Sequence, residues 1–152
     1  MESLKLLLEH AERERDLCLA AGQTALAHHV AAQAQHEQLL AYRCDYEQRW
    51  RGHFGQQGQM ELVRCYHGFM IRLSQAVEHQ ELAVQQAAQH LEAARAALRE
   101  REVRVASVRK LIERRHRRVR TEDDRREQKL TDERGARQVQ DSAFPSGMAS
   151  MY

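Results

Sequence analysis

The sequence predicts an all-α protein that folds as a long antiparallel two-helix coiled coil, a helical hairpin. Its 152 residues include one proline and 5% aromatic residues, while Ala, Leu, Glu, Gln and Arg, all strong helix formers, are abundant. Apolar residues recur every three or four positions through the second half of the chain. Inside the chain, glycines cluster only at Gly52, Gly55 and Gly58. A β or α/β fold would need more aromatic and β-branched residues and more frequent turns.

The first expected helix spans about residues 2–51 and carries a broad apolar stripe rather than a strict repeat. Gly22 lies inside this stripe, where glycine costs about 1 kcal/mol relative to alanine. The stripe consists of Leu4, Leu8, Ala11, Cys18, Gly22, Ala25 or Leu26, His29 or Val30, Ala32, Leu39 or Leu40, Tyr46 and Trp50.

A turn is expected over residues 52–59, and its short length favours antiparallel neighbours. Folding about its midpoint pairs residues whose numbers sum to about 111. Tyr46 then lies opposite Cys65, and Tyr42 lies opposite Phe69. Everything after about residue 110 has no partner within the hairpin.

The second expected helix spans about residues 60–134, and a flexible tail is expected over 138–152, so that the hairpin domain is 1–137. Fourteen of its 17 seam positions are apolar or aromatic, with a period of 3.5 residues that is typical of a coiled coil. The seam positions are Val63, Tyr66, Met70, Leu73, Val77, Gln80, Val84, Ala87, Leu91, Ala94, Leu98, Arg101, Val105, Val108, Ile112, Arg115 and Val119.

Charge is distributed unevenly along the chain. Residues 99–137 hold 15 Lys+Arg and 9 Asp+Glu, a net of +6, so the remainder carries −4 of the total of +2. Three cysteines without CxxC spacing fit a reducing cytosol. Residues 17–36 lack formal charges, but their His, Gln and Thr side chains argue against a membrane span. No secretory signal is recognisable.

Nothing in the sequence indicates an enzyme, a cofactor site or a metal site. A two-helix hairpin offers no cleft that excludes water from a reacting group. The nine histidines include no HxxxH pair, so we interpret them as solvated or seam-edge residues.

An aromatic and aliphatic cluster is expected near the turn. Leu39, Tyr42 and Tyr46 share one face of the first helix, and Phe69 and Ala76 should lie beside the seam of the second, partly exposed. Such tyrosines suit a protein contact, because aromatic residues are enriched at binding hot spots. Spacing alone leaves a second interpretation equally open, in which they only widen the core.

A basic segment covers residues 109–120, where seven of twelve residues are Lys or Arg. It can be a solvated charged helix, or it can bind an acidic protein, an acidic lipid surface or nucleic acid. The acidic residues that follow it, from Glu122 onward, argue against a dedicated nucleic-acid arm.

Three stretches, in order, resemble the flagellar FliJ family of bacterial type III export proteins. Residues 38–46 (QLLAYRCDY) resemble the end of the family's first helix, residues 69–80 (FMIRLSQAVEHQ) its Phe-x3-Leu-x2-Ala segment, and residues 125–133 (RREQKLTDE) its closing segment. The resemblance covers about residues 2–137. It implies a stalk-like coiled coil, soluble in the cytoplasm and peripheral to the inner membrane at the flagellar base.

The resemblance also implies partners: the export ATPase ring, the cytosolic part of the transmembrane export gate, and export chaperones, with neither nucleic-acid binding nor membrane insertion. It favours the partner-site interpretation of the aromatic cluster. The expected gate-binding residues are Gln35, Leu39, Tyr42, Tyr46, Phe69, Leu73, Ala76 and Gln80. The expected ATPase-binding residues are Arg109, Lys110, Arg114, Arg117, Arg118 and Arg125, near the start of the first helix. The alternatives are a stalk protein of a virulence type III secretion system and a generic scaffolding or nucleic-acid-binding coiled coil.

Overall fold

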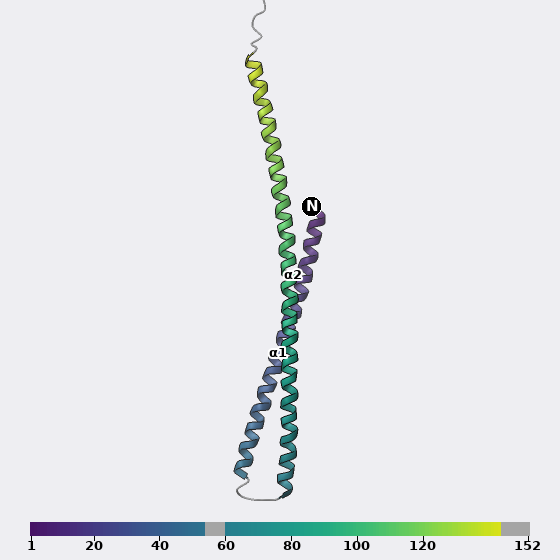
Figure 1. Ribbon diagram of the computed structural model, residues 1–152, viewed down its shortest axis with the longest axis vertical. Helices are drawn as coiled ribbons and strands as arrows, with labels where there is room; N and C mark the ends of the chain where they lie inside the picture. Colours follow the sequence, from purple (N-terminus) through teal and green to yellow (C-terminus); the bar gives the residue numbers. More distant parts are fainter. Residues whose placement is uncertain (54–59, 144–152) are drawn as a thin grey trace, which may run out of the picture.

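The computed structural model describes residues 1–53 and 60–143, which form two long helices. Helix α1 spans Glu2–His53 and helix α2 spans Met60–Ala143. The two run antiparallel and pack against each other, and α1 crosses from one side of α2 to the other along the rod (Figure 1). The predicted helical hairpin is therefore confirmed. At 1.5 Å per residue, α1 is roughly 78 Å long and α2 roughly 126 Å.

Both helices extend further than the sequence suggested. Helix α1 includes Gly52, and α2 continues through Gly135 to Ala143 instead of ending near residue 134. Residues 138–143 of the expected flexible tail are therefore helical. One glycine costs only about 1 kcal/mol, and the Ala, Arg and Gln residues around Gly135 favour a helix. Most of the expected turn and the rest of the tail, residues 54–59 and 144–152, lie outside the described residues.

The seam of α2 follows the predicted repeat closely. Fifteen of its 17 positions are buried or half-buried, and the exceptions are Arg115 and Val119 at the far end. The most buried side chains of α2 are all seam residues: Leu73, Val77, Leu91, Val105 and Val108. The core of the protein is thus a narrow line of contacts between two helices.

The seam of α1 is a strict heptad repeat rather than the broad stripe expected. All 14 of its positions are buried or half-buried: Leu4, Leu8, Ala11, Arg15, Cys18, Gly22, Ala25, His29, Ala32, His36, Leu39, Arg43, Tyr46 and Trp50. The repeat is not visible as a pattern of apolar residues in the sequence, because four of its positions are occupied by Arg15, His29, His36 and Arg43. The Nδ1 atom of His29 is buried and has no hydrogen-bond partner among the described residues.

The helices meet in a slightly different register from the predicted one. Tyr46 packs against Phe69 rather than opposite Cys65, and Arg101 pairs with Glu14, so in both of these side-chain contacts the residue numbers sum to 115 rather than to about 111. Helical side chains lean toward the N-terminus of their own helix. In an antiparallel pair, each side chain therefore contacts the other helix at a level closer to the N-terminus of its own helix than its Cα atom. The residue numbers of two side chains in contact then sum to more than those of two residues whose Cα atoms lie at the same level along the rod.

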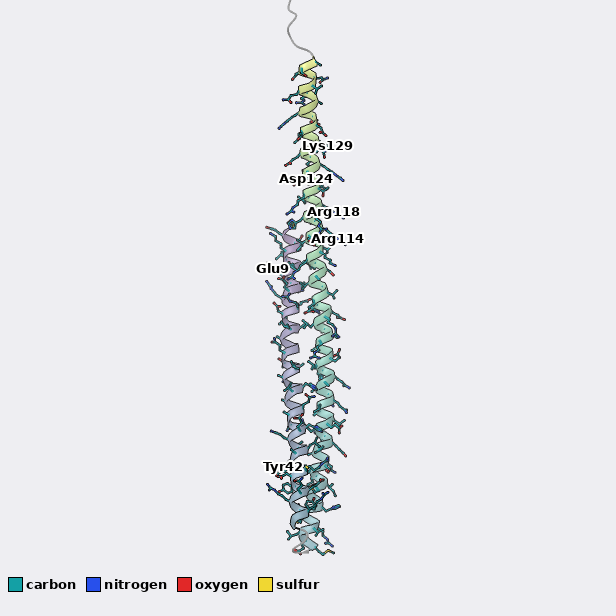
Figure 2. The ribbon with its side chains drawn as sticks, turned by 90° about the vertical axis from the view of Figure 1, so that its left-hand side faces the viewer. Glu9, Tyr42, Arg114, Arg118, Asp124 and Lys129 are labelled. Carbon is teal, nitrogen blue, oxygen red and sulfur yellow. The ribbon has the colours of Figure 1, made fainter. Side chains whose placement is uncertain are left out.

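Helix α2 continues as a single helix beyond the start of α1, as predicted. Ile112 is the last half-buried residue, and every residue from 113 to 143 is exposed. Figure 2 shows Arg114, Arg118, Asp124 and Lys129 along this extension, with Glu9 on the neighbouring end of α1. The basic segment therefore lies where the two-helix rod becomes a single helix.

Candidate protein-binding site

Three aromatic rings from both helices form a continuous cluster near the turn. The ring centroids of Tyr42 and Tyr46 on α1 lie 5.2 Å apart, and those of Tyr46 and Phe69 on α2 lie 4.7 Å apart. Both pairs are tilted, a geometry that aromatic quadrupoles favour. Tyr46 is thus the bridge between one exposed ring on each helix.

The heptad positions explain why these rings share one flank of the rod. Tyr42 follows the seam residue Leu39 by three positions and precedes Tyr46 by four. Phe69 stands in the same relation to two seam residues of α2, and equivalent flanking positions lie on one side of an antiparallel pair. Tyr42 is 51% exposed and Phe69 is 37% exposed, so a partner can contact both.

The other predicted gate residues divide between this flank and the seam. Gln35 and Ala76 occupy the same flanking heptad position as Tyr42 and Phe69, and both are exposed. Leu39 is half-buried and Leu73 is only 7% exposed. Gln80 also lies in the seam, where its Nε2 atom donates a hydrogen bond to the Ala32 carbonyl oxygen at 3.0 Å. Four of the eight residues therefore form the accessible surface.

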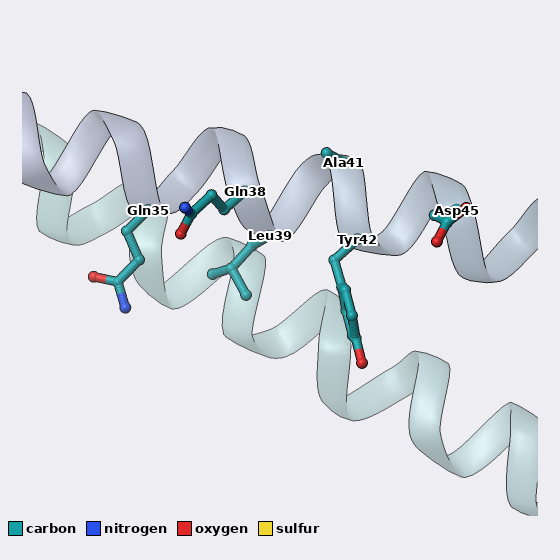
Figure 3. A pocket seen from close by; sticks show the side chains of 6 residues that line it. All are labelled: Gln35, Gln38, Leu39, Ala41, Tyr42 and Asp45. Carbon is teal, nitrogen blue, oxygen red and sulfur yellow. The ribbon is translucent and has the colours of Figure 1, made fainter.

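A surface hollow on α1 adjoins the cluster and adds residues that the sequence did not single out. Figure 3 shows Gln35, Leu39 and Tyr42 extending from α1 on the side where α2 runs. The hollow is also lined by Gln38, Ala41 and Asp45. These three are exposed, and Asp45 is ion-paired with Arg49 at 3.3 Å. Only their helical spacing from Tyr42 could have indicated them.

A second aromatic pair lies between the cluster and the turn. The rings of Trp50 and Tyr66, both half-buried seam residues, have centroids 4.2 Å apart. This contact joins the two helices beyond the Tyr46–Phe69 contact. The Trp50–Tyr66 contact therefore helps to hold the two helices together next to the aromatic cluster.

Four of the predicted ATPase-binding residues, Arg114, Arg117, Arg118 and Arg125, lie on the exposed extension of α2, whereas Arg109 and Lys110 lie just before it. Arg109 pairs with Glu12 of α1 at 3.0 Å, and Arg117 pairs with Glu113 within α2 at 3.6 Å. Lys110 and Arg125 are exposed. The ion pair of Arg109 thus joins the N-terminal part of α1 to α2.

Arg114 and Arg118 line a second hollow, at the place where α1 begins. Its other lining residues are Leu4, Leu111, Arg115, Val119 and Glu122. Leu111 and Val119 are 49% and 46% exposed, so this hollow combines apolar and cationic side chains. Arg115 and Val119 continue the heptad repeat past residue 110, where the sequence predicted no partner helix, and both are exposed. The sequence did not indicate that they line a hollow.

Two further observations concern the described part of the chain. Across residues 1–53 and 60–143, no group of three or more His, Cys, Asp or Glu side chains is arranged to hold a metal ion. Neither described helix contains a stretch apolar and long enough to cross a bilayer.

The fold defines an elongated helical hairpin whose exposed aromatic residues come from both helices. The family model for "Flagellar FliJ protein" matches residues 1–143. The chain belongs to this family, and it is therefore a protein related to flagellar export. Searches among curated proteins and among solved structures returned no match.

Proposed function

We propose that this protein is a stalk-like component of the flagellar type III export apparatus that links the export ATPase ring to the transmembrane export gate and escorts export chaperones. It acts in the cytoplasm, peripherally at the inner membrane beneath the flagellar base. The proposal rests on family membership and on one structural observation, the aromatic cluster of Tyr42, Tyr46 and Phe69.

The exposed flank of the cluster supports gate binding. Exposed aromatic side chains lose water favourably on binding and are common hot spots. Here the exposed rings come from two helices. A partner that contacts both rings therefore recognises the folded hairpin and not either helix alone. Gln35 and Ala76 extend the same flank without adding charge.

The opposite end of the rod suits a different partner. The hollow around Arg114 and Arg118 carries exposed cations next to Leu111 and Val119. Such a surface favours an acidic partner that also supplies apolar side chains. The two sites lie at opposite ends of α1, as a link between two assemblies requires.

The double variant Tyr42→Ala with Phe69→Ala tests the gate site. It removes the two exposed rings and leaves Tyr46 and the seam in place. We expect helicity and the melting temperature to change little, while pull-down of the gate's cytosolic part is lost.

Val30→Ala with Ile71→Ala is the matched control, because it also removes one exposed apolar side chain from each helix (55% and 48% exposed). Retention of gate binding by the aromatic double variant, at wild-type strength, would contradict the proposal. Loss of binding by the control pair would show that the contact is not confined to the aromatic flank.

A further inference from the structure

The flank that carries Tyr42 and Phe69 continues along the rod toward its middle. Counting by sevens from these two rings gives the residues that share their heptad position. From Tyr42 to Ala21 on α1, and from Phe69 to His90 on α2, the flank is roughly 31 Å long. We call this surface the extended flank; its further members are Gln35, His28 and Ala21 on α1 and Ala76, Ala83 and His90 on α2, all exposed or half-buried.

The extended flank differs in charge from the opposite flank at the same level of the rod. With histidine neutral, none of its residues carries a formal charge, and in the neighbouring outward row on the same side only Arg72 does. The opposite flank instead holds four exposed glutamates: Glu37 on α1 and Glu78, Glu81 and Glu92 on α2. In a chain with 30% charged residues, this asymmetry sets one side of the rod apart.

A surface hollow lies at the far end of the extended flank, in the middle of the two-helix rod. Alanines and one imidazole from each helix line it: Ala21, Ala25 and His28 of α1 and Ala83, Ala87 and His90 of α2. The hollow beside Tyr42 lies at the near end of the same flank (Figure 3). Alanine side chains let a third backbone approach closely, because the distance between packed helices depends on the side chains at the contact. The extended flank therefore offers rings at one end and close backbone approach at the other.

The occupant that fits this surface is an α-helix. An extended peptide needs partners for its backbone N–H and C=O groups, and two helices use theirs within themselves. A helix satisfies its own backbone and contacts such a surface through side chains three and four residues apart. A length of roughly 31 Å corresponds to about three heptads of the occupant.

The charges decide the chemistry of the contacting face. A charged side chain of the occupant would meet no opposite charge on the extended flank except beside Arg72, and burying an unpaired charge is costly. The contacting face is therefore apolar or uncharged, and the charges of the occupant lie on its side that faces water. The opposite flank is a poor surface for the same face, because covering it would strip water from its glutamates.

We propose that the extended flank docks one amphipathic helix of the gate's cytosolic part, about three heptads long, whose contacting face is apolar and uncharged. The helix runs from Tyr42 and Phe69 to the hollow at His28 and His90, where it completes a local three-helix bundle. This inference rests on the proposed function for the identity of the partner. It goes beyond that function in the extent of the contact and in the chemistry of the segment that makes it.

Site-directed photo-crosslinking on the full chain maps the docked segment, with the gate's cytosolic part as the probe. A benzophenone amino acid replaces one exposed residue at a time: Gln35, His28 or His90 on the extended flank, and Gln33 or Gln85 on the opposite flank as matched controls. We expect adducts from the three positions on the extended flank and none from the two controls. Equal adducts from both flanks would overturn the inference.

The positions of the adducts distinguish a helix from an extended segment. Gln35 and His28 are seven residues apart on α1, roughly 10.5 Å along its axis. On the gate, their adducts should lie about seven residues apart if the segment is helical and about three apart if it is extended. Mass spectrometry of the crosslinked peptides measures this spacing, and a spacing of about three would also overturn the inference.

A charge placed in the hollow tests the contact independently. Ala21→Glu should raise the dissociation constant for the gate's cytosolic part about tenfold, because docking would bury the carboxylate. Ala20→Glu is the matched control, since Ala20 is the exposed neighbour on the outer face of α1, and it should bind as the parent does. Both variants should keep the parental melting temperature, because alanine and glutamate are both good helix formers.

The remaining outcomes separate this inference from the proposed function. Adducts from Gln35 but not from His28 or His90, with parental binding by Ala21→Glu, would overturn the inference and leave the proposed gate site standing. Adducts between two copies of this chain in the absence of the gate would assign the flank to self-association and overturn the inference as well. No adduct from Gln35, with gate binding retained by Tyr42→Ala with Phe69→Ala, would contradict the proposed function itself.

Discussion

Arg101 occupies a seam position of α2, and its Nη1 atom donates a hydrogen bond to Oε2 of Glu14 on α1. The two residues are 87 positions apart in the chain. Their side chains are 38% and 28% exposed, so the pair lies at the edge of the seam and not within a dry core. An arginine at a position otherwise reserved for apolar residues is thus accommodated by a carboxylate from the other helix.

A double-mutant cycle of Arg101→Met and Glu14→Gln should give a coupling energy of about 1 kcal/mol, because the pair is only partly screened by water. The control cycle uses Arg99→Met and Glu92→Gln, an exposed pair within α2 at 3.2 Å. Its coupling should stay below about 0.5 kcal/mol. Equal coupling energies for the two pairs, measured by urea unfolding, would show that the Arg101–Glu14 pair stabilises the fold no more than an exposed pair within one helix.

His29→Leu should raise the free energy of unfolding by about 1 kcal/mol, since it puts an apolar group in place of a buried nitrogen that has no hydrogen-bond partner within residues 1–53 and 60–143. Thermal unfolding followed by circular dichroism measures the effect. His28→Leu is the control, because His28 is the exposed neighbour. Destabilisation by His29→Leu would mean that the imidazole makes a favourable contact in solution.

Val105→Ala should lower the free energy of unfolding by about 2 kcal/mol, because the side chain is buried and its removal leaves a gap between the helices. Val105 is 3% exposed, whereas Val103, two residues away, is 65% exposed. Val103→Ala should therefore change stability by less than about 0.5 kcal/mol. A comparable loss in both variants, by urea titration, would contradict the position of the seam at this end.

Arg114→Glu with Arg118→Glu should weaken binding to the export ATPase at least tenfold, about 1.4 kcal/mol, through charge reversal beside the apolar hollow. Binding of the parent should also weaken as salt rises, since surface charges are screened within about 10 Å at 0.1 M. Arg126→Glu with Lys129→Glu makes the same charge change outside the hollow. Salt-independent binding, or equal losses in the two double variants, would count against docking at the hollow.

The seam of α2 was predictable because its residues are large, apolar and regularly spaced. The seam of α1 was not predictable in this way. Positions such as Arg15 and His36 are half-buried because they contact α2, and the polarity of these residues gives no sign of that contact. The register contained a similar error. Counting residues from the turn ignores the lean of side chains along each helix, and this lean pairs Tyr46 with Phe69.

The site was predictable in part for the same reason. Tyr42, Phe69 and Ala76 lie beside the seam as their spacing indicated, and their exposure agrees with it. The inward direction of Gln80 was not predictable, because a glutamine at a seam position can turn either to solvent or to the opposite backbone. Their contacts with the gate remain predictions.

The length of α2 governs how the protein diffuses. A rod of roughly 126 Å has a radius of gyration of roughly 36 Å, whereas a compact domain of this chain length would have roughly 15 Å. A monomer of 17.7 kDa will therefore leave a gel-filtration column at the volume of a much larger globular protein. Sedimentation equilibrium and light scattering weigh particles irrespective of shape, so these methods distinguish an elongated single chain from an oligomer where the elution volume alone does not.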